Sequence, residues 1–175
     1  FPFLRFVDVM NGARLDEKSF TALVTVDEKQ LNSFSVHYGD TFFARTSETP
    51  DDIGMANTYI GENVDAVFNG FCIRGRPKAK DLFPNFSRYI FRAQYVRDQM
   101  LKLCKYTTRA GISSESLGSC VLLIPPLSEQ EKIAEILTSL DDQIEAVESK
   151  LVHLESLKKS LMGDLLTGRV RVSVD

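Results

Sequence analysis

The chain has 175 residues, of which 43% are hydrophobic and 26% are charged, and its formal net charge is −3. These values describe a soluble folded protein with room for one globular domain and one further long element. No apolar run approaches the length of a membrane span and no signal-peptide pattern opens the chain, so we expect a cytoplasmic protein without membrane contact. Because the sequence starts at Phe1, inside an expected strand, we expect it to continue upstream.

Short strands are expected in the first part of the chain. Apolar residues predict strands over 3–10, 34–38 and 41–45, and turn residues follow at 11–12 and 39–40. The second and third of these strands should therefore meet at the Gly-Asp turn of residues 39–40.

The middle of the chain predicts a loop, a hairpin and a helix in succession. Residues 46–54 are rich in hydroxyls and acids, so we expect an exposed loop there. Residues 65–74 carry Asn-Gly at 69–70, which predicts a hairpin because Asn-Gly accepts both positive φ angles of a type I′ turn. Helical spacing follows over 87–106, and a short buried strand is expected over 120–124. The domain should be α+β and mostly β.

The net charge hides a partition along the chain. Residues 71–109 hold ten basic against two acidic side chains, whereas residues 1–70 and 128–165 are acidic overall. A localised basic segment is typical of a surface that faces phosphate, although a solvated charged face gives the same count. Charge alone therefore leaves DNA binding and an ordinary surface equally open.

The C-terminal part predicts one long helix with a heptad seam. Apolar residues recur at alternating steps of four and three, and Lys158 fills the one polar position. Two prolines at 125–126 precede the helix, Ser128 and Glu131 suit a capping box, and Gly168 suits the C-cap. The predicted helix-pairing residues are Ile133, Leu137, Leu140, Ile144, Val147, Leu151, Leu154, Leu161 and Leu165.

Such a helix would be on the order of 57 Å long, and a domain of this size cannot cover its whole seam. We therefore expect a partner helix from another domain, another copy or another subunit, rather than a helix folded on its own core. Lys158 would face itself in a parallel pair of identical helices, which favours an antiparallel coiled coil. The expected divisions are a globular domain over 1–127, a helix over 128–168 and a tail over 169–175.

The sequence contains no constellation that predicts catalysis. It has no glycine-rich phosphate loop, no paired Cys or His ligands, and no nucleophile-elbow pattern. The cysteines Cys72, Cys104 and Cys120 are odd in number and widely spaced, which indicates reduced thiols rather than a disulfide or metal site. We therefore expect a non-catalytic chain with no metal and no cofactor of its own.

Several stretches together resemble one known family. The helical region from PPLSEQEKIAEIL to LLTGRVRV resembles the conserved helix of the specificity subunit of Type I restriction-modification systems. Preceding stretches resemble the target recognition domain of that family, and the resemblance covers essentially the whole chain. These stretches are FLRFVDV, GDTFFARTSETPDDIG, AVFNGFCIRGRPK and TTRAGISSESLGSCVLLIPP.

The resemblance implies a sequence-specific DNA-recognition subunit for one half of a bipartite target. Such subunits usually carry two recognition domains whose helices pair antiparallel, and they bind methyltransferase (M) subunits and a restriction (R) subunit. S-adenosylmethionine, ATP and Mg belong to those partner subunits. With one domain and one helix, this chain resembles either the C-terminal half of a subunit or a half-size protein that pairs with a second copy. Both remain open.

The DNA-binding candidates lie in polar loops that supply hydrogen bonds to bases and phosphates. Two loops match family stretches, and a basic run follows the expected hairpin. The candidates are Arg45, Thr46, Ser47, Arg74, Arg76, Lys78, Lys80, Thr107, Thr108 and Arg109. Two other interpretations remain: a recognition module of a single-chain restriction-methylation enzyme, and a coiled-coil assembly protein without a nucleic-acid role.

Overall fold

A computed structural model describes residues 1–11, 14–78, 80–106 and 108–173. The chain divides into two compact units, Phe1–Ala134 and Glu135–Asp175, which are treated separately below. The turn predicted at 11–12 lies partly outside the described residues, and the candidate Thr107 lies wholly outside them. The expected α+β class, with a long C-terminal helix, is confirmed.

Small sheets form the first unit. Each sheet has three strands, and the strand in the middle differs in its place along the chain. One sheet has the order β2 (Ala22–Leu23), β1 (Pro2–Leu4), β6 (Val67–Phe68). The second has the order β5 (Ala56–Thr58), β3 (Thr41–Ala44), β7 (Cys72–Gly75). The third has the order β4 (Thr46–Ser47), β9 (Ala110–Gly111), β8 (Lys105–Tyr106).

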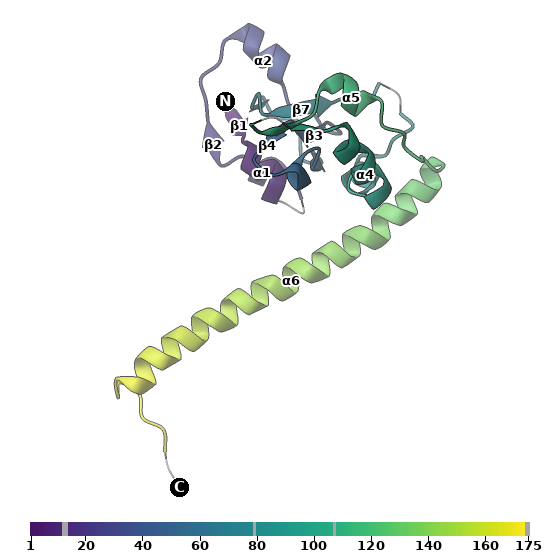
Figure 1. The fold of residues 1–175 in the computed structure, drawn as a ribbon. Coiled ribbons are helices and arrows are strands. Elements are labelled where there is room, and N and C mark those ends of the chain that lie inside the picture. The colour runs from purple at the N-terminus through teal and green to yellow at the C-terminus, as the bar shows by residue number, and fades with distance from the viewer. Residues whose placement is uncertain (12–13, 79, 107, 174–175) are drawn as a thin grey trace. The chain divides into compact units, whose positions relative to one another are not determined.

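Short helices connect these sheets (Figure 1). Their starts follow ordinary capping chemistry, since Asp27 and Gln30 form a capping box and the Ser113 hydroxyl accepts from the Ser116 N–H. The helices are α1 (Phe6–Asn11), α2 (Glu28–Phe34), α3 (Pro84–Ile90), α4 (Gln94–Leu103) and α5 (Ser114–Gly118). Two single 3₁₀ turns lie at Glu17–Ser19 and Pro50–Asp52.

Strand β3 joins the two main hydrophobic clusters. Its four residues are all buried. Phe42 belongs to the cluster around Leu4, and Phe43 belongs to the cluster around Met100, because successive strand residues point to opposite faces. Burying each phenylalanine stabilises the fold by roughly 1.5–3 kcal/mol. The fully buried β3 is therefore the centre of the first unit.

The two strands predicted before β3 are wrong in part. Over 3–10, β1 ends at Leu4 and α1 follows, because the Asp8 carboxylate accepts from the backbone N–H and the guanidinium of Arg5 and closes a helical turn. Over 34–38, Phe34 ends α2, and β3 pairs with β5 and β7 instead of with these residues. Gly39 does form a turn, with a φ angle of 87°.

The predicted hairpin over 65–74 is also wrong. Its two strands, β6 and β7, belong to different sheets and pair with β1 and β3. Asn69 still makes a turn, because its side chain accepts from the Phe71 N–H at 2.8 Å. Gly70 is not among the described glycines with positive φ, so a type I′ turn is excluded. A turn-forming dipeptide thus redirects the chain from one sheet to another.

Three local predictions need smaller corrections. The loop over 46–54 contains β4 and ends on Ile53, which is fully buried. The helix over 87–106 is split into α3 and α4 at Phe91, whose ring packs edge-on against Phe43 at 4.9 Å. Residues 120–124 form no strand in the described structure. The Gln99 side chain hydrogen-bonds both backbone groups of Val121 there, in place of a neighbouring strand.

Helix α6 (Leu127–Leu166) has 40 residues and is unbroken (Figure 1). It starts directly after Pro126, whose carbonyl accepts from Glu129 and Gln130, so Ser128 lies inside the first turn and is not the N-cap. Gly168 has a φ angle of 71° and donates to the Leu165 carbonyl, so the predicted C-terminal glycine stop is confirmed.

The first turns of α6 pack within the first unit. The Gln130 side chain is fully buried and hydrogen-bonds the Phe83 N–H and the carbonyls of Asp81 and Pro125, each at 2.8 Å. Ala134 is also buried. Every polar atom of the Gln130 amide therefore has work in the fold, and the compact unit extends to Ala134 rather than to residue 127.

Burial of Cys72 gives a test of this core. Burial disfavours the thiolate and raises the pKa of Cys72 from 9.0 to about 12. At pH 8.5 we expect iodoacetamide to label the partly buried Cys104 while Cys72 reacts only after urea is added. Because the unfolded thiol ionises first, the free energy of unfolding should also fall as the pH rises above about 9. Rapid labelling of native Cys72 would contradict the buried position.

Candidate nucleic-acid interface

The third sheet brings together two loops that are about sixty residues apart in the sequence. Strand β9 pairs with β4 through Ser47 and Ala110, and with β8 through Tyr106 and Ala110. The Arg45 carbonyl accepts from the Ile112 N–H at 3.0 Å, which continues the pairing beyond β4. The predicted candidates of residues 45–47 and 108–109 therefore lie on one edge of the domain. We call this edge, formed by residues 45–49 and 105–109, the sheet-edge site.

The described side chains of this site are largely open to solvent. Arg45, Thr108 and Arg109 are exposed, while Thr46 is partly buried. Lys105 and Tyr106 are exposed as well, and the Tyr106 side chain is exposed by 61%. An exposed tyrosine beside lysine and arginine offers both a ring for stacking and charges for phosphate. Sequence reasoning missed Tyr106, although an aromatic residue directly before a Thr-Thr-Arg run was a usable signal.

One candidate, Ser47, supports the loop from within. Its hydroxyl donates to the Asp52 carboxylate at 2.9 Å, and the Thr49 hydroxyl donates to the same carboxylate at 2.7 Å. These hydrogen bonds, that of Thr49 first, lower the pKa of Asp52. The Ser47 hydroxyl therefore positions the loop that carries Arg45.

An acidic residue also lies in the site. The Glu48 carboxylate is 3.8 Å from the guanidinium of Arg109, and both side chains are largely exposed. Exposed ion pairs contribute about 0–1 kcal/mol. Because this pair is so weak, Arg109 can exchange Glu48 for a phosphate or a base at little cost.

The structure corrects the predicted role of Arg74 and Arg76. Arg76 forms two hydrogen bonds of 2.7 Å with the Asp40 carboxylate. Arg74 donates to the Ser35 carbonyl at 2.6 Å and lies 5.5 Å from the centre of the Phe68 ring. Both guanidinium groups bind the protein itself, so they connect β7 to its neighbours and are not free phosphate contacts. Lys78 and Lys80 are exposed, as a phosphate contact requires.

Other arginines of the basic segment are also used internally. Arg88 and Arg97 are buried, and Arg97 donates to the carbonyls of Ile53 and Asp51. Burial lowers the pKa of Arg97. Arg92 donates to the Ala56 carbonyl at 2.8 Å. Much of the positive charge counted over 71–109 therefore stabilises the fold instead of facing a ligand.

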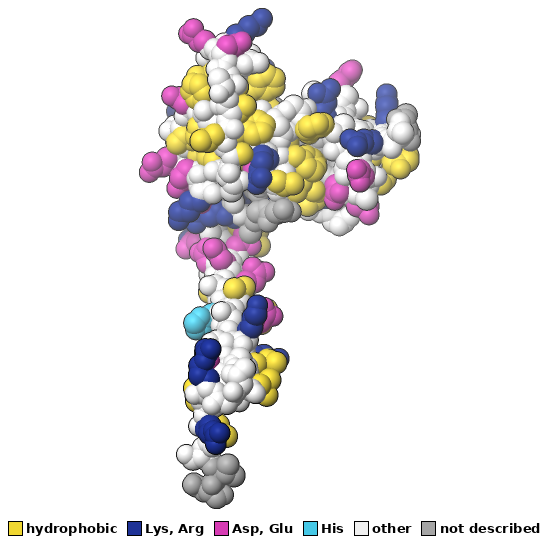
Figure 2. Space-filling view, turned by 90° about the vertical axis from the view of Figure 1, so that its left-hand side faces the viewer, with side chains coloured by type: hydrophobic (Ala, Val, Ile, Leu, Met, Phe, Trp, Pro, Cys, Tyr) yellow, Lys and Arg dark blue, Asp and Glu magenta, His cyan; other side chains and the backbone are white. Residues whose placement is uncertain are grey.

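The pairing face of α6 divides into a covered and an uncovered part. Ile133 packs against the cluster of Phe86 and Ile90, and Leu137 is partly buried. The remaining apolar seam residues are 42–67% exposed. They are Leu140, Ile144, Val147, Leu151, Leu154, Leu161 and Leu165. On the face drawn in Figure 2, apolar side chains of α6 lie open among charged ones.

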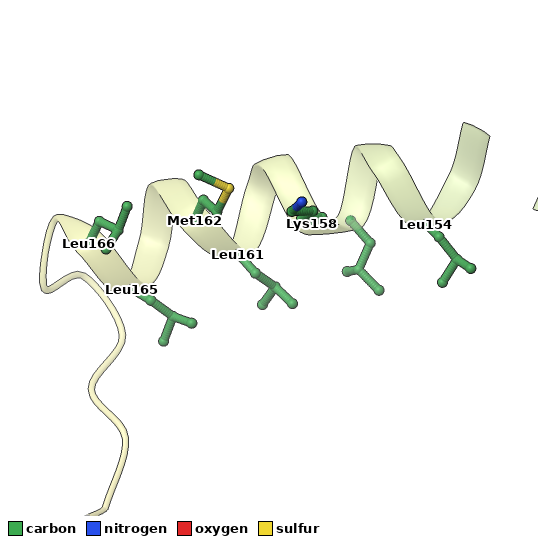
Figure 3. Close-up of a pocket in the computed structure, with 7 residues that line it drawn as sticks. Leu154, Lys158, Leu161, Met162, Leu165 and Leu166 are labelled. Atoms are coloured by element: carbon green, nitrogen blue, oxygen red, sulfur yellow. The ribbon is translucent and has the colours of Figure 1, made fainter. Parts of the chain in front are cut away.

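The C-terminal end of α6 carries the widest apolar surface. Figure 3 shows Leu154, Leu161 and Leu165 pointing to one side of the helix, with Met162 and Leu166 turned away from them. Together with Leu157 and Lys158, these residues border a shallow apolar depression on the helix surface. An apolar stripe of this length on a soluble helix needs a covering partner.

Neither a metal site nor a membrane span is found in the described part of the chain. No group of three or more His, Cys, Asp or Glu side chains there could hold a metal ion. No helix among the described residues is long and apolar enough to cross a membrane.

These features define a class of protein, a compact α+β domain with an exposed basic edge that continues into a long amphipathic helix. The family of Type I restriction modification DNA specificity domains matches residues 2–156. The chain belongs to this family, and the resemblance inferred from its motifs is confirmed.

Two curated relatives are specificity subunits. The chain is 27% identical over 175 residues to the Type I restriction enzyme EcoKI specificity subunit of Escherichia coli, which covers 97% of this chain and 37% of that protein. It is 31% identical over 172 residues to the putative type I restriction enzyme MjaX specificity subunit of Methanocaldococcus jannaschii, covering 95% and 39%. The chain thus spans less than two fifths of the length of these relatives.

Solved structures show the same fold. The S subunit of a Type I restriction-modification system from M. genitalium aligns with a TM-score of 0.52 at 15% identity, covering 76% of this chain and 34% of that one. A chain from a structure of the assembly and conformational transition of the type I R-M system aligns with a TM-score of 0.57 at 18% identity, covering 91% and 35%.

Proposed function

We propose that this chain is the DNA-recognition half of a Type I specificity subunit and that its sheet-edge site contacts one half of a bipartite target. The observation that carries the proposal is the β4–β9–β8 sheet, which joins two polar loops from distant parts of the chain. Arg45, Lys105, Tyr106 and Arg109 are exposed together on that edge. The domain then acts by binding, and catalysis belongs to other subunits.

The long helix supplies the spacing in this proposal. Its uncovered seam binds a second helix antiparallel, so that two recognition domains lie at a fixed separation on double-stranded DNA. A fixed separation fixes the distance between half-sites, as in other two-lobed DNA readers. The methyltransferase and restriction subunits bind this assembly and supply S-adenosylmethionine, ATP and Mg. The names of the family and of its relatives support these partners.

The salt dependence of DNA binding tests the site. We expect the double variant Arg45→Ala, Arg109→Ala to bind random-sequence duplex DNA more weakly than the parent chain. The slope of log K against log salt should fall by about 0.9 for each lost phosphate contact. The measurement is fluorescence anisotropy of a labelled duplex between about 50 and 200 mM salt, the range over which such slopes are resolved.

A matched control uses a distant cation. Lys29→Ala removes an exposed positive charge from α2, which contributes no strand to the sheet-edge site. Its salt slope should equal that of the parent chain. Equal slopes for all three proteins would place the DNA contact elsewhere and overturn the proposed site.

A further inference from the structure

The residues that flank the seam of α6 carry information about its partner. In heptad notation the seam residues alternate between positions a and d, with Leu137 and Ile144 at a, and position e follows each d residue. Three successive e positions are Asp141, Glu148 and Glu155. All three lie on α6 beside the uncovered seam, and Glu148 and Glu155 are exposed. We call these three residues the acidic column.

The orientation of the pair decides what the acidic column faces. In a parallel pair of identical helices, Lys158 at position a would lie opposite its own copy. In an antiparallel pair, a positions lie opposite d positions, and the e residues of one helix face the e residues of the other. The antiparallel arrangement removes the Lys158 conflict but sets the acidic columns against each other.

A second copy of the chain therefore makes a poor partner in every register. When Leu140 lies opposite Lys158 of the second copy, Glu148 faces its own counterpart and Asp141 faces Glu155. A shift by one heptad sets Glu148 against either Glu155 or Asp141. Like charges directly opposed across an interface disfavour that pairing.

We propose that the partner of α6 is not a second copy but a different helix that carries basic residues at its e positions. This inference rests on the helix pairing of the proposed function and names the partner's chemistry. An antiparallel helix with Lys or Arg at e covers the leucine seam and neutralises the acidic column at the same time. It also excludes self-pairing by competition, because specificity is a difference between two affinities.

A charge-reversed version of the full chain is the probe for such a partner. The column variant carries Asp141→Lys, Glu148→Lys and Glu155→Lys. The control variant carries Glu131→Lys, Asp142→Lys and Glu145→Lys, which make the same change in net charge at exposed positions facing away from the seam. Native mass spectrometry of differently tagged mixtures at low salt gives the amounts of mixed and unmixed dimers.

Parent and column variant together should form mixed dimers at least about tenfold above the statistical ratio, and this excess should shrink as salt screens the charges. Parent and control variant should mix at the statistical ratio. Statistical mixing in both cases would leave helix pairing intact and overturn the inference about the partner. Monomers in every mixture, across a concentration series, would show that the helix pairing itself is wrong, and the inference would fail with it.

Discussion

Arg76→Ala is expected to lower the free energy of unfolding by about 2–4 kcal/mol, whereas Lys78→Ala should change it by less than about 0.5 kcal/mol. The Asp40 side chain is 1% exposed and makes two hydrogen bonds of 2.7 Å with Arg76. Without the guanidinium, the buried carboxylate keeps the His37 N–H at 2.8 Å as its donor but loses its counter-charge. A buried charge without its partner is costly.

Urea unfolding followed by circular dichroism measures this difference. Both variants remove one positive charge from neighbouring positions of the basic segment, so a general charge effect would move both equally. If Arg76→Ala kept the stability of the parent chain and lost DNA affinity instead, Arg76 would be a phosphate contact and its assignment to the fold would be wrong.

The second large effect concerns the helix seam. Leu151→Asp should abolish pairing of α6, weakening association by roughly 30-fold to 1,000-fold, because a buried leucine at an interface centre contributes about 2–4 kcal/mol. The stability of the first unit should not change, since Leu151 is 55% exposed and lies outside that unit. Sedimentation velocity with the partner helix, and thermal unfolding of the chain alone, measure the two quantities.

Val152→Asp is the matched control for this experiment. Val152 is 65% exposed and lies next to Leu151 but off the seam. Its replacement should leave association within about threefold of the parent value, as expected for a solvent-facing position. Equal losses for both variants would mean that the partner does not bind along the heptad seam.

Helix α6 was accessible from sequence because its signals are local. The seam from Ile133 to Leu165 repeats every few residues, and Gly168 marks the end. The exact start was not predictable from Ser128 alone, because the carbonyl of Pro126 serves the first free N–H groups just as well.

The strands were less accessible because their pairing is not local. Strands β6 and β7 flank Asn69-Gly70 in the way a hairpin would, yet β1 and β3 compete for them with better burial. Many strands of this domain have only two residues, which is too short for an alternating pattern to register. The segment over 120–124 shows the converse, since Gln99 replaces a strand partner.

The candidate site was half accessible for a related reason. The polar loops of Arg45 and Arg109 were identified from residue type, and β9 places them on one edge. The arginines of residues 71–109 could not be sorted, because an arginine that binds Asp40 and one that binds phosphate look alike in a sequence. Only the buried acceptors around Arg74, Arg76 and Arg97 separate the two roles.

Photo-cross-linking at the sheet-edge site tests the central claim most directly. p-Benzoylphenylalanine in place of Tyr106 should cross-link to a random-sequence DNA duplex on irradiation. The same replacement at Tyr38, which is 48% exposed but outside this site, should not. Cross-links at Tyr106 alone are the predicted result. Cross-links at Tyr38 without any at Tyr106 would show that DNA binds another face, contradicting the proposed interface.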